Sequence, residues 1–287
     1  MWFASPADVR ERLTAVDYLA DDAIATSVFL ASALGKPLLA EGPAGVGKTQ
    51  LAKAVAAATG ARLIRLQCYE GLDEARALYE WNYKKQLLRI QAGAGPEGDR
   101  DWSTTHDDIF TEEFLLERPL LAAIRTETPT VLLIDETDKA DVEVEGLLLE
   151  ILSDYQVTIP ELGTITAVSR PYVVLTSNAA RELSEALKRR CLYLYLEYPT
   201  PERERDIVLA QVPGIEAELA EQLARTVATM RALELKKAPS IAETIDWANT
   251  LLALGRTELD EETTGATLGV VLKHASDQAR ARKELGL

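Results

Sequence analysis

The chain has 287 residues, enough for one large domain or two smaller ones with a core that needs no disulfides or metals. It carries 31 basic and 46 acidic residues, a net charge of -15, which disfavours general attraction to a nucleic-acid backbone. Two cysteines, Cys68 and Cys191, fit a reducing compartment. No run approaches the ~18 apolar residues of a membrane span, and residues 1–12 lack the apolar stretch of a cleaved leader. We therefore expect a soluble, cytoplasmic protein without a membrane span.

Five short apolar runs, separated by helical patterns, predict strands. They are residues 37–41, 62–68, 129–135, 172–177 and 191–197. Runs such as 131–134 are apolar on both faces, which is typical of parallel strands covered by helices on each side. Between the first two runs, residues 51–59 repeat apolar side chains at helical spacing, and Gly60 ends that helix. The pattern predicts an α/β fold with a doubly wound parallel sheet of five strands.

After residue 199 the chain shows helical periodicity and no strand pattern. The predicted helices are residues 202–211, 215–232, 241–254 and 263–284. Turn-forming pairs at 213–214 and 239–240 separate them. The sequence therefore predicts a core domain over residues 1–199 that holds the chemistry, and a small all-helical domain over residues 200–287 that covers it.

One segment, residues 93–117, does not fit a minimal sheet. It begins with a glycine-rich run and carries eight acidic residues between Glu97 and Glu117, against the single basic residue Arg100. The favoured interpretation of residues 97–117 is a solvated surface loop, and the alternative is a charged face that docks a partner.

Residues 42–49 match the phosphate-binding pattern of glycine, four residues, glycine, lysine and serine or threonine. Their sequence is Gly42-Pro43-Ala44-Gly45-Val46-Gly47-Lys48-Thr49. Glycines let successive backbone N–H groups surround an anion, Lys48 can reach terminal phosphates, and the Thr49 hydroxyl can ligate Mg²⁺. A strand precedes the motif and a helix follows it, and the N-terminus of that helix also favours phosphate. The sequence therefore predicts a site for nucleotide phosphates.

Two acids and an amide stand at the ends of later strands. Asp135 and Glu136 end the run 129–135, where an aspartate can hold Mg²⁺ and a glutamate can polarise a water for attack on phosphate. Asn178 follows the run 172–177, where an amide can hydrogen-bond the attacking water or a terminal phosphate oxygen. Asp138 is interpreted as a loop charge. Together these residues predict hydrolysis of the bound nucleotide.

The order of these motifs, followed by Ala-Leu-Lys-Arg-Arg-Cys at residues 186–191, a last strand and a helical lid, resembles an AAA+ ATPase. Residues 135–140, Asp-Glu-Thr-Asp-Lys-Ala, are similar to the Asp-Glu-Ile-Asn-Arg-Ala string of the MoxR family. Within that family, residues 67–73 and 79–83 resemble the subgroup that accompanies carbon monoxide dehydrogenase maturation. The resemblance covers nearly the whole chain and implies a P-loop NTPase core with a helical lid, with ATP and Mg²⁺ as cofactors.

The AAA+ resemblance also implies a homo-oligomer, commonly a hexameric ring, with ATP at the subunit interfaces. An arginine of one subunit then completes the neighbour's site. Arg190, which precedes Cys191 where the family usually has Arg-Phe, is the expected finger, and Arg189 is the second candidate. The alternative role for both is a basic helix end that satisfies carbonyl groups. Gln67 stands where related proteins place a polar residue that restrains the catalytic glutamate.

The MoxR resemblance further implies two insertions. One spans residues 78–90, and the other is a hairpin of residues 156–159 and 164–168, whose alternating pattern supports it independently. One departure concerns the lid, where many family members carry an arginine after a proline to touch the terminal phosphate. Here Ser240 follows Pro239, and Lys237 is the candidate substitute.

The expected function is ATP hydrolysis coupled to remodelling of a protein client. The resemblance implies a metalloenzyme client, such as a molybdenum/copper carbon monoxide dehydrogenase, or a von Willebrand A-type partner. A nucleic-acid motor is the alternative, because Tyr79, Trp81 and Tyr83 with nearby basic residues could stack bases, although the net charge disfavours it. Two other classes of protein are less favoured. A small-molecule phosphotransferase usually lacks an acidic pair such as Asp135–Glu136. A scaffold that is switched by nucleotide and scarcely hydrolyses it would not need Glu136, so the presence of this glutamate argues against that class.

Overall fold

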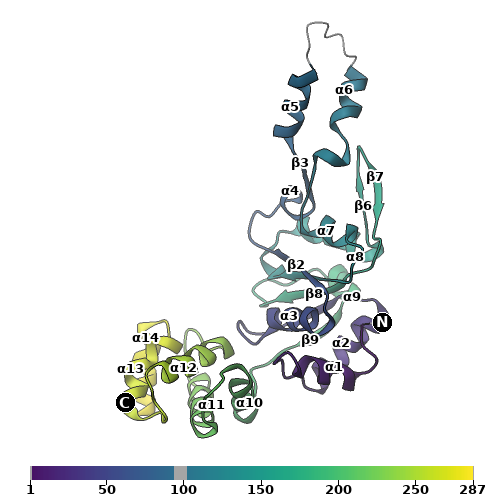
Figure 1. Cartoon of the computed structure of the whole chain (residues 1–287). Helices are drawn as coiled ribbons and strands as arrows, with labels where there is room; N and C mark the ends of the chain where they lie inside the picture. The colour runs from purple at the N-terminus through teal and green to yellow at the C-terminus, as the bar shows by residue number, and fades with distance from the viewer. Residues whose placement is uncertain (1, 94–101, 287) are drawn as a thin grey trace.

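The computed structural model describes residues 2–93 and 102–286 and shows a five-stranded parallel sheet between helices, with a helical C-terminal region (Figure 1). The sheet contains β1 (Leu38–Glu41), β2 (Arg62–Gln67), β5 (Thr130–Asp135), β8 (Tyr172–Ser177) and β9 (Leu192–Tyr195). Their order across the sheet is β2-β5-β8-β1-β9, and every pairing is parallel. The five strands coincide with the five apolar runs, so the predicted α/β fold is confirmed.

Alternate residues of the central strands enter two different cores. In β5, Leu132 and Ile134 pack on one side of the sheet, whereas Val131 and Leu133 pack on the other. The first core includes residues of α7 (Pro119–Arg125), α8 (Val142–Asp154) and α9 (Glu185–Arg190). The second includes residues of α1 (Pro6–Thr14), α2 (Asp22–Leu34) and α3 (Lys48–Thr59). Burial on both faces explains why these strands are apolar throughout rather than alternating.

The C-terminal region has a third core of its own, centred on the fully buried Trp247. It consists of α10 (Pro201–Gln211), α11 (Ala217–Arg231), α12 (Ile241–Ala253), α13 (Glu261–Val271) and α14 (Ala275–Leu285). Figure 1 shows this region to one side of the sheet, joined to it by the segment that follows β9. As predicted, the region is helical.

The prediction of one continuous helix over residues 263–284 is wrong, because the structure has two separate helices there, α13 and α14. Leu272 takes an extended conformation and is buried, so the chain leaves the helical path there. Gln278 Nε2 donates to the carbonyl oxygen of Leu272 at 2.8 Å, replacing a helical hydrogen bond. The periodicity continues across the break because both helices pack against the same core, so the sequence alone conceals it.

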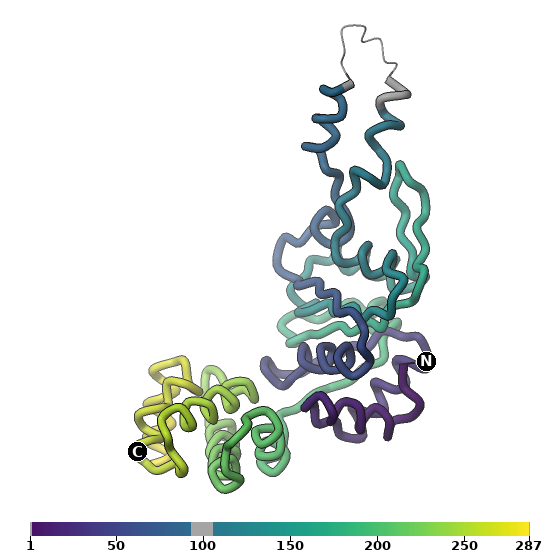
Figure 2. Tube along the Cα trace, in the orientation of Figure 1, coloured from purple at the N-terminus to yellow at the C-terminus, as the bar shows by residue number. Residues whose placement is uncertain are grey.

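An arm, defined here as residues 79–93 and 102–117, projects from the sheet between β2 and β5 (Figures 1 and 2). It is preceded by α4 (Glu74–Ala77) and contains β3 (Tyr79–Trp81), α5 (Tyr83–Gly93), α6 (Trp102–Ile109), the 3-10 helix η1 (Glu112–Phe114) and β4 (Leu115–Glu117). Strands β3 and β4 pair antiparallel at its base. The insertion predicted over residues 78–90 is therefore only the outward half of a longer one.

The acidic run forms the returning half of the arm rather than a solvated loop, as far as it is described; residues 97–101 lie outside the described ranges. Glu113 pairs with Lys85 of α5 at 2.8 Å, and Asp108 pairs with Arg89 at 3.1 Å. Two acidic side chains of the returning half thus pair with two basic residues of the outward helix.

The aromatic residues at the arm base do not form a stacking strip. The Trp81 side chain is buried and packs edge-on against Phe110, with ring centroids 5.1 Å apart, and edge-on against Tyr79 at 6.3 Å. Tyr83 is exposed, so the three predicted rings are not presented together. The arrangement does not favour the nucleic-acid alternative, which needs exposed rings beside unpaired cations.

The predicted hairpin is present as β6 (Gln156–Ile159) and β7 (Gly163–Thr166), which pair antiparallel around residues 160–162. In Figure 1 the hairpin and the arm both rise above the sheet, away from α1 and α2. None of the helices within residues 2–93 and 102–286 has the length and apolar character needed to cross a bilayer.

A buried ion pair of Glu204 on α10 helps to hold the helical region together. Its fully buried carboxylate accepts hydrogen bonds from Arg231 Nη1 at 2.5 Å, Arg231 Nη2 at 2.8 Å and Thr244 Oγ1 at 2.7 Å. The substitution Glu204→Ala leaves a buried guanidinium unpaired, so we expect the free energy of unfolding to fall by about 3–5 kcal/mol. Urea unfolding followed by tryptophan fluorescence measures this loss.

The matched control is Glu221→Ala, which removes the partner of Arg225 in an exposed pair on α11. An exposed pair contributes less than about 1 kcal/mol, so the control should unfold almost as the wild type does. Equal losses in the two variants would contradict the role given to the buried pair.

Candidate functional site

A cavity of about 770 Å³ lies at the carboxyl ends of β5 and β8 and beside the loop that follows β1. This edge is where ligands bind in open parallel α/β sheets. Residues of the phosphate-binding motif, of the strand ends and of the C-terminal region line it. They include Ala44, Gly45, Val46, Gly47, Lys48, Thr49, Asp135, Glu136, Thr176, Asn178, Ile241 and Ile245. Five chemically distinct predicted residues, Lys48, Thr49, Asp135, Glu136 and Asn178, are thereby brought together.

Two of the loop glycines, Gly42 and Gly45, are required by close approaches from elsewhere in the chain. A Cβ on Gly45, whose φ is 75°, would lie 2.2 Å from the Cβ of Ser240 at the start of α12. A Cβ on Gly42 would lie 2.0 Å from the carbonyl oxygen of Leu196. The Ile241 N–H also donates to the Gly45 carbonyl at 3.2 Å. The helical region therefore rests directly on the phosphate-binding loop.

Lys48 is held inside its own loop. Its ammonium donates to the carbonyl oxygens of Gly42 at 2.7 Å and Pro43 at 2.6 Å, and neither of these two predicted residues lines the cavity. Burial lowers the pKa of Lys48, and the carboxylates of Asp138 and Asp135 oppose that shift. A charged, desolvated ammonium at this place is suited to bind a phosphate oxygen.

Asp135 is buried at the end of β5 and collects hydroxyl donors from two other elements. Thr49 Oγ1 donates to its Oδ1 at 2.8 Å, and Thr176 Oγ1 donates to the same oxygen at 2.6 Å. A hydroxyl and a carboxylate in contact are hard oxygen donors of the kind that Mg²⁺ takes alongside phosphate oxygens and water. The residues present therefore fit the predicted metal. Thr176 was missed in the sequence, although the parallel register of β5 and β8 places it beside Asp135.

Glu136 is fixed from three sides. Its backbone is left-handed, with φ 57°, and its N–H donates to Thr176 Oγ1 at 2.8 Å. Its Oε2 accepts from Gln67 Nε2 at 2.9 Å and from Lys139 Nζ at 2.6 Å. Gln67 thus contacts the glutamate, as the resemblance implies. A lysine that pairs with Glu136 was not predicted.

Asn178 follows β8 at the cavity wall and is half-buried. The next residue, Ala179, has φ 57°, and the N–H of Ala180 donates to Asp138 Oδ2 at 3.0 Å. Asp138 is 3% exposed, so its interpretation as a loop charge is wrong. It instead ties the segment after β5 to the turn that carries Asn178.

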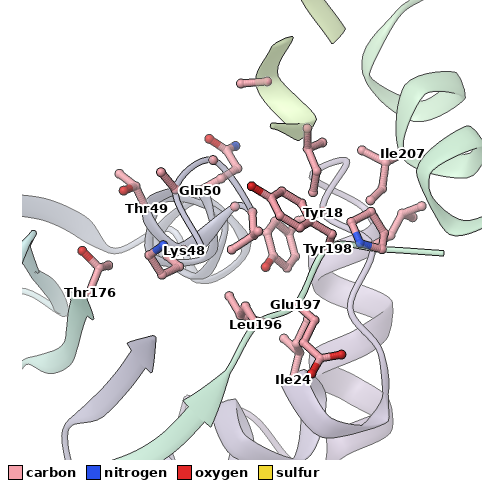
Figure 3. Close-up of a pocket in the computed structure, with 18 of the residues that line it drawn as sticks. Tyr18, Ile24, Lys48, Thr49, Gln50, Thr176, Leu196, Glu197, Tyr198 and Ile207 are labelled. Atoms are coloured by element: carbon pink, nitrogen blue, oxygen red, sulfur yellow. The ribbon is translucent and has the colours of Figure 1, made fainter. Parts of the chain in front are cut away.

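Figure 3 shows the two ends of the cavity, with Lys48, Thr49 and Thr176 at one end and Tyr18, Tyr198 and Ile207 at the other. Burial raises the pKa of Tyr18 well above its ordinary value, so the phenol stays neutral. An aromatic and aliphatic end next to a phosphate-binding loop is suited to a planar base. No motif in the sequence signals these residues.

Arg189 and Arg190 lie at the exposed C-terminal end of α9 and do not line the cavity of their own chain. Arg190 Nε donates to Ser153 Oγ at 2.6 Å, and its Nη1 donates to the carbonyl oxygen of Ala186 at 3.2 Å. The second contact is the carbonyl-satisfying role that was the alternative for this residue. Contact with a nucleotide would therefore require a second copy of the chain.

The position after Pro239, where the resemblance would place an arginine, is occupied by Ser240. Ser240 is buried and caps α12, where it forms a reciprocal capping box with Glu243. Lys237, the candidate substitute, donates to Glu243 Oε1 at 3.0 Å and does not line the cavity. The backbone and side chain of the capping residue, rather than a cation, thus approach the phosphate-binding loop.

Sequence comparison matches residues 37–191, more than half of the chain, to the family described as AAA domain (dynein-related subfamily). Comparison with curated proteins finds no match. Two solved variants of RuvB from Thermotoga maritima are 17% and 19% identical, with TM-scores of 0.46 and 0.47, and cover 99% of this chain and 71% and 70% of their own. A third structure, Thermotoga maritima RuvB titled as a Holliday junction branch migration motor, is 18% identical, with a TM-score of 0.44 and coverages of 97% and 69%.

Glu145 of α8 anchors the segment that follows Asn178 and gives a pH prediction. Its buried carboxylate accepts from Arg181 Nη2 at 2.5 Å and from the Ser184 N–H at 2.9 Å. Although burial alone would raise it, these hydrogen bonds lower the pKa of Glu145 below its ordinary value. The stabilisation is therefore present above the unfolded-state pKa of about 4.3 and is lost as the pH falls through the lower folded-state pKa.

We expect Glu145→Gln to lower the thermal midpoint at about pH 7 and to differ less from the wild type below about pH 4. The matched control is Glu150→Gln, an exposed position beyond the first turn of the same helix, which should follow the wild type closely at every pH. A midpoint difference for Glu145→Gln that stays constant with pH would contradict the assignment.

Proposed function

Because the chain belongs to the dynein-related subfamily of AAA domain proteins, we propose that it binds ATP with Mg²⁺ in this cavity and hydrolyses ATP to ADP and phosphate. The observation that carries the proposal is the convergence of Lys48, Thr49, Asp135 and Glu136 on one cavity beside an apolar, aromatic end. AAA domains generally bind ATP with Mg²⁺, and the donor set here suits both.

We propose a role for each predicted residue from its position in the cavity. The backbone of residues 42–49 and the Lys48 ammonium bind the phosphates, and Thr49 with Asp135 holds Mg²⁺, which supplies charge neutralisation at the phosphates. Glu136 polarises the attacking water, because its carboxylate lies at the cavity wall next to the metal-binding pair. Asn178 orients that water through its amide. Gln67 and Lys139 position Glu136.

We infer a ring-shaped homo-oligomer, proposed to be a hexamer, in which Arg190 reaches the neighbour's phosphates and Arg189 is the second candidate. The support is that both arginines are exposed and lie outside the cavity of their own chain. AAA domains commonly assemble as rings, and an arginine supplied in trans stabilises charge in phosphoryl transfer.

We propose that the boundary between the two domains lies between residues 199 and 200, because the third hydrophobic core contains only residues beyond it.

We propose further that ATP hydrolysis drives a MoxR-type, chaperone-like remodelling of a protein client. The proposed client is a metalloenzyme such as a molybdenum/copper carbon monoxide dehydrogenase, or a von Willebrand A-type partner. The arm supports a protein client, because Tyr83, Leu87 and Leu88 of α5 are exposed apolar side chains on a projecting element. The resemblance to the MoxR family, rather than any contact in the structure, suggests this client.

The chemical step is tested by Glu136→Gln. This variant keeps the size of the side chain but removes the charge that polarises water, so turnover should fall at least about a hundredfold. ATP binding, measured by calorimetry, should stay near that of the wild type. Lys48→Ala is the contrasting variant and should lose ATP binding itself. Wild-type turnover in Glu136→Gln would contradict the role of this glutamate.

The shared site is tested by mixing two inactive variants. Arg190→Ala should lose turnover, because the neighbour's site lacks its arginine, although its own ATP site is intact. Lys48→Ala cannot bind ATP but keeps its arginine. Mixed rings should therefore regain part of the wild-type turnover, and sedimentation on the same samples should show assembly. Mixtures as inactive as either variant alone, or full turnover in Arg190→Ala, would rule out this arginine, and the same pairing with Arg189→Ala tests the second candidate.

A further inference from the structure

Arg65 of β2 holds the carboxylate that is expected to bind the metal. Both its Nε and its Nη2 donate to Asp135 Oδ2, at 3.0 Å and 2.6 Å. The Asp135 side chain is 3% exposed, whereas that of Arg65 is 47% exposed. The guanidinium therefore approaches a buried acid from the solvent side and could leave it without opening the core.

The same guanidinium is connected to the second carboxylate of the site. Arg65 Nη2 also donates to Gln67 Oε1, and Gln67 Nε2 donates to Glu136 Oε2 at 2.9 Å. Arg65 and Gln67 are two residues apart on one strand, so their side chains share a face. The parallel register places Gln67 beside Asp135. One cation thus contacts the metal-binding acid directly and the water-polarising acid through one amide.

The two oxygens of Asp135 are used differently. Its Oδ1 already accepts from the hydroxyls of Thr49 and Thr176, so Oδ2 is the oxygen left for a cation, and Arg65 takes it. A guanidinium paired with this carboxylate cancels much of the negative charge that a divalent cation requires. Arg65 and Mg²⁺ would therefore compete for the Asp135 carboxylate.

We propose that Arg65 is a positioning residue that competes with Mg²⁺ for Asp135 and sets the Mg²⁺ concentration at which nucleotide is held tightly. The inference rests on the proposed ATP site. Arg65 bound to Asp135 stabilises the buried carboxylate while no metal is present, and its release from Asp135 accompanies metal binding. When Arg65 leaves Asp135, its hydrogen bond to Gln67 also changes, and Gln67 in turn contacts Glu136. Metal binding at Asp135 would therefore alter the hydrogen bonding of the water-polarising Glu136.

The test measures ADP binding by calorimetry over a series of Mg²⁺ concentrations, which needs no turnover. In Arg65→Gln the Mg²⁺ concentration that gives half of the Mg²⁺-dependent gain in ADP affinity should fall roughly three- to tenfold, as expected from removing one nearby cation. ADP affinity in EDTA should change less than about twofold, because Arg65 is not expected to contact the nucleotide. The result that overturns the proposal is an unchanged or increased Mg²⁺ requirement.

The matched control is Arg62→Gln. Arg62 is an exposed arginine at the opposite end of the same strand, so its loss removes an equal charge away from the site. Its Mg²⁺ requirement should equal that of the wild type. A fall of the same size in both variants would show a general charge effect and would also overturn the proposal.

A second variant keeps the test decisive if Arg65→Gln does not fold. Arg65→Lys retains the charge but loses one of the two hydrogen bonds to Asp135, so a smaller fall in the Mg²⁺ requirement is expected. No fall in this variant would overturn the proposal. Failure of the proposed function looks different, because wild-type protein would then bind no ADP at any Mg²⁺ concentration. ADP binding that depends on Mg²⁺ in the wild type but responds identically in the Arg65 variants would refute only the role of Arg65.

Discussion

A nearly fully buried carboxylate, Asp135, is the constraint on which the site depends. Removing a carboxylate from water is costly unless hydrogen bonds or a counter-charge replace the lost hydration. Here the replacements come from three elements, with Thr49 from α3, Thr176 from β8 and Arg65 from β2. The charge of Asp135 therefore fixes how the phosphate-binding loop and two neighbouring strands end relative to β5.

The helical region depends on the loop in a comparable way. Gly45 has no side chain, and Ser240 occupies the space that a Cβ would fill. Because Ser240 also caps α12 and is held by Glu243, a displacement of the loop would be passed to a helix end rather than to a single side chain. Thr244 Oγ1 contacts both the Ser240 carbonyl and the buried Glu204, which pairs with Arg231, so such a displacement would reach the packed helices behind α12.

The sequence predicted the central strands β1, β5 and β8 well, because burial on both faces leaves a short, continuous apolar run in each of them. The phosphate-binding pattern and the Asp135–Glu136 pair could be recognised in the sequence because their spacing is local, and the structure brings them to one cavity. The sequence prediction failed where the decisive contact joins distant segments. Thr176 and Arg65 matter only through the parallel register of neighbouring strands, and the break at Leu272 follows from packing that preserves the helical period. The acidic half of the arm was misjudged because its partners lie on the opposite helix.

The arm has the shape of a lever, because β3 and α5 follow one another along it and β3 is braced at the base by pairing with β4 (Figure 1). The 3 residues of β3 extend about 10 Å and the 11 residues of α5 about 16 Å, so the outward half reaches about 26 Å from its base. A tilt of about 10° at the base would then carry the far end of α5 through about 4.5 Å. A displacement of this size would be enough to separate two packed surfaces.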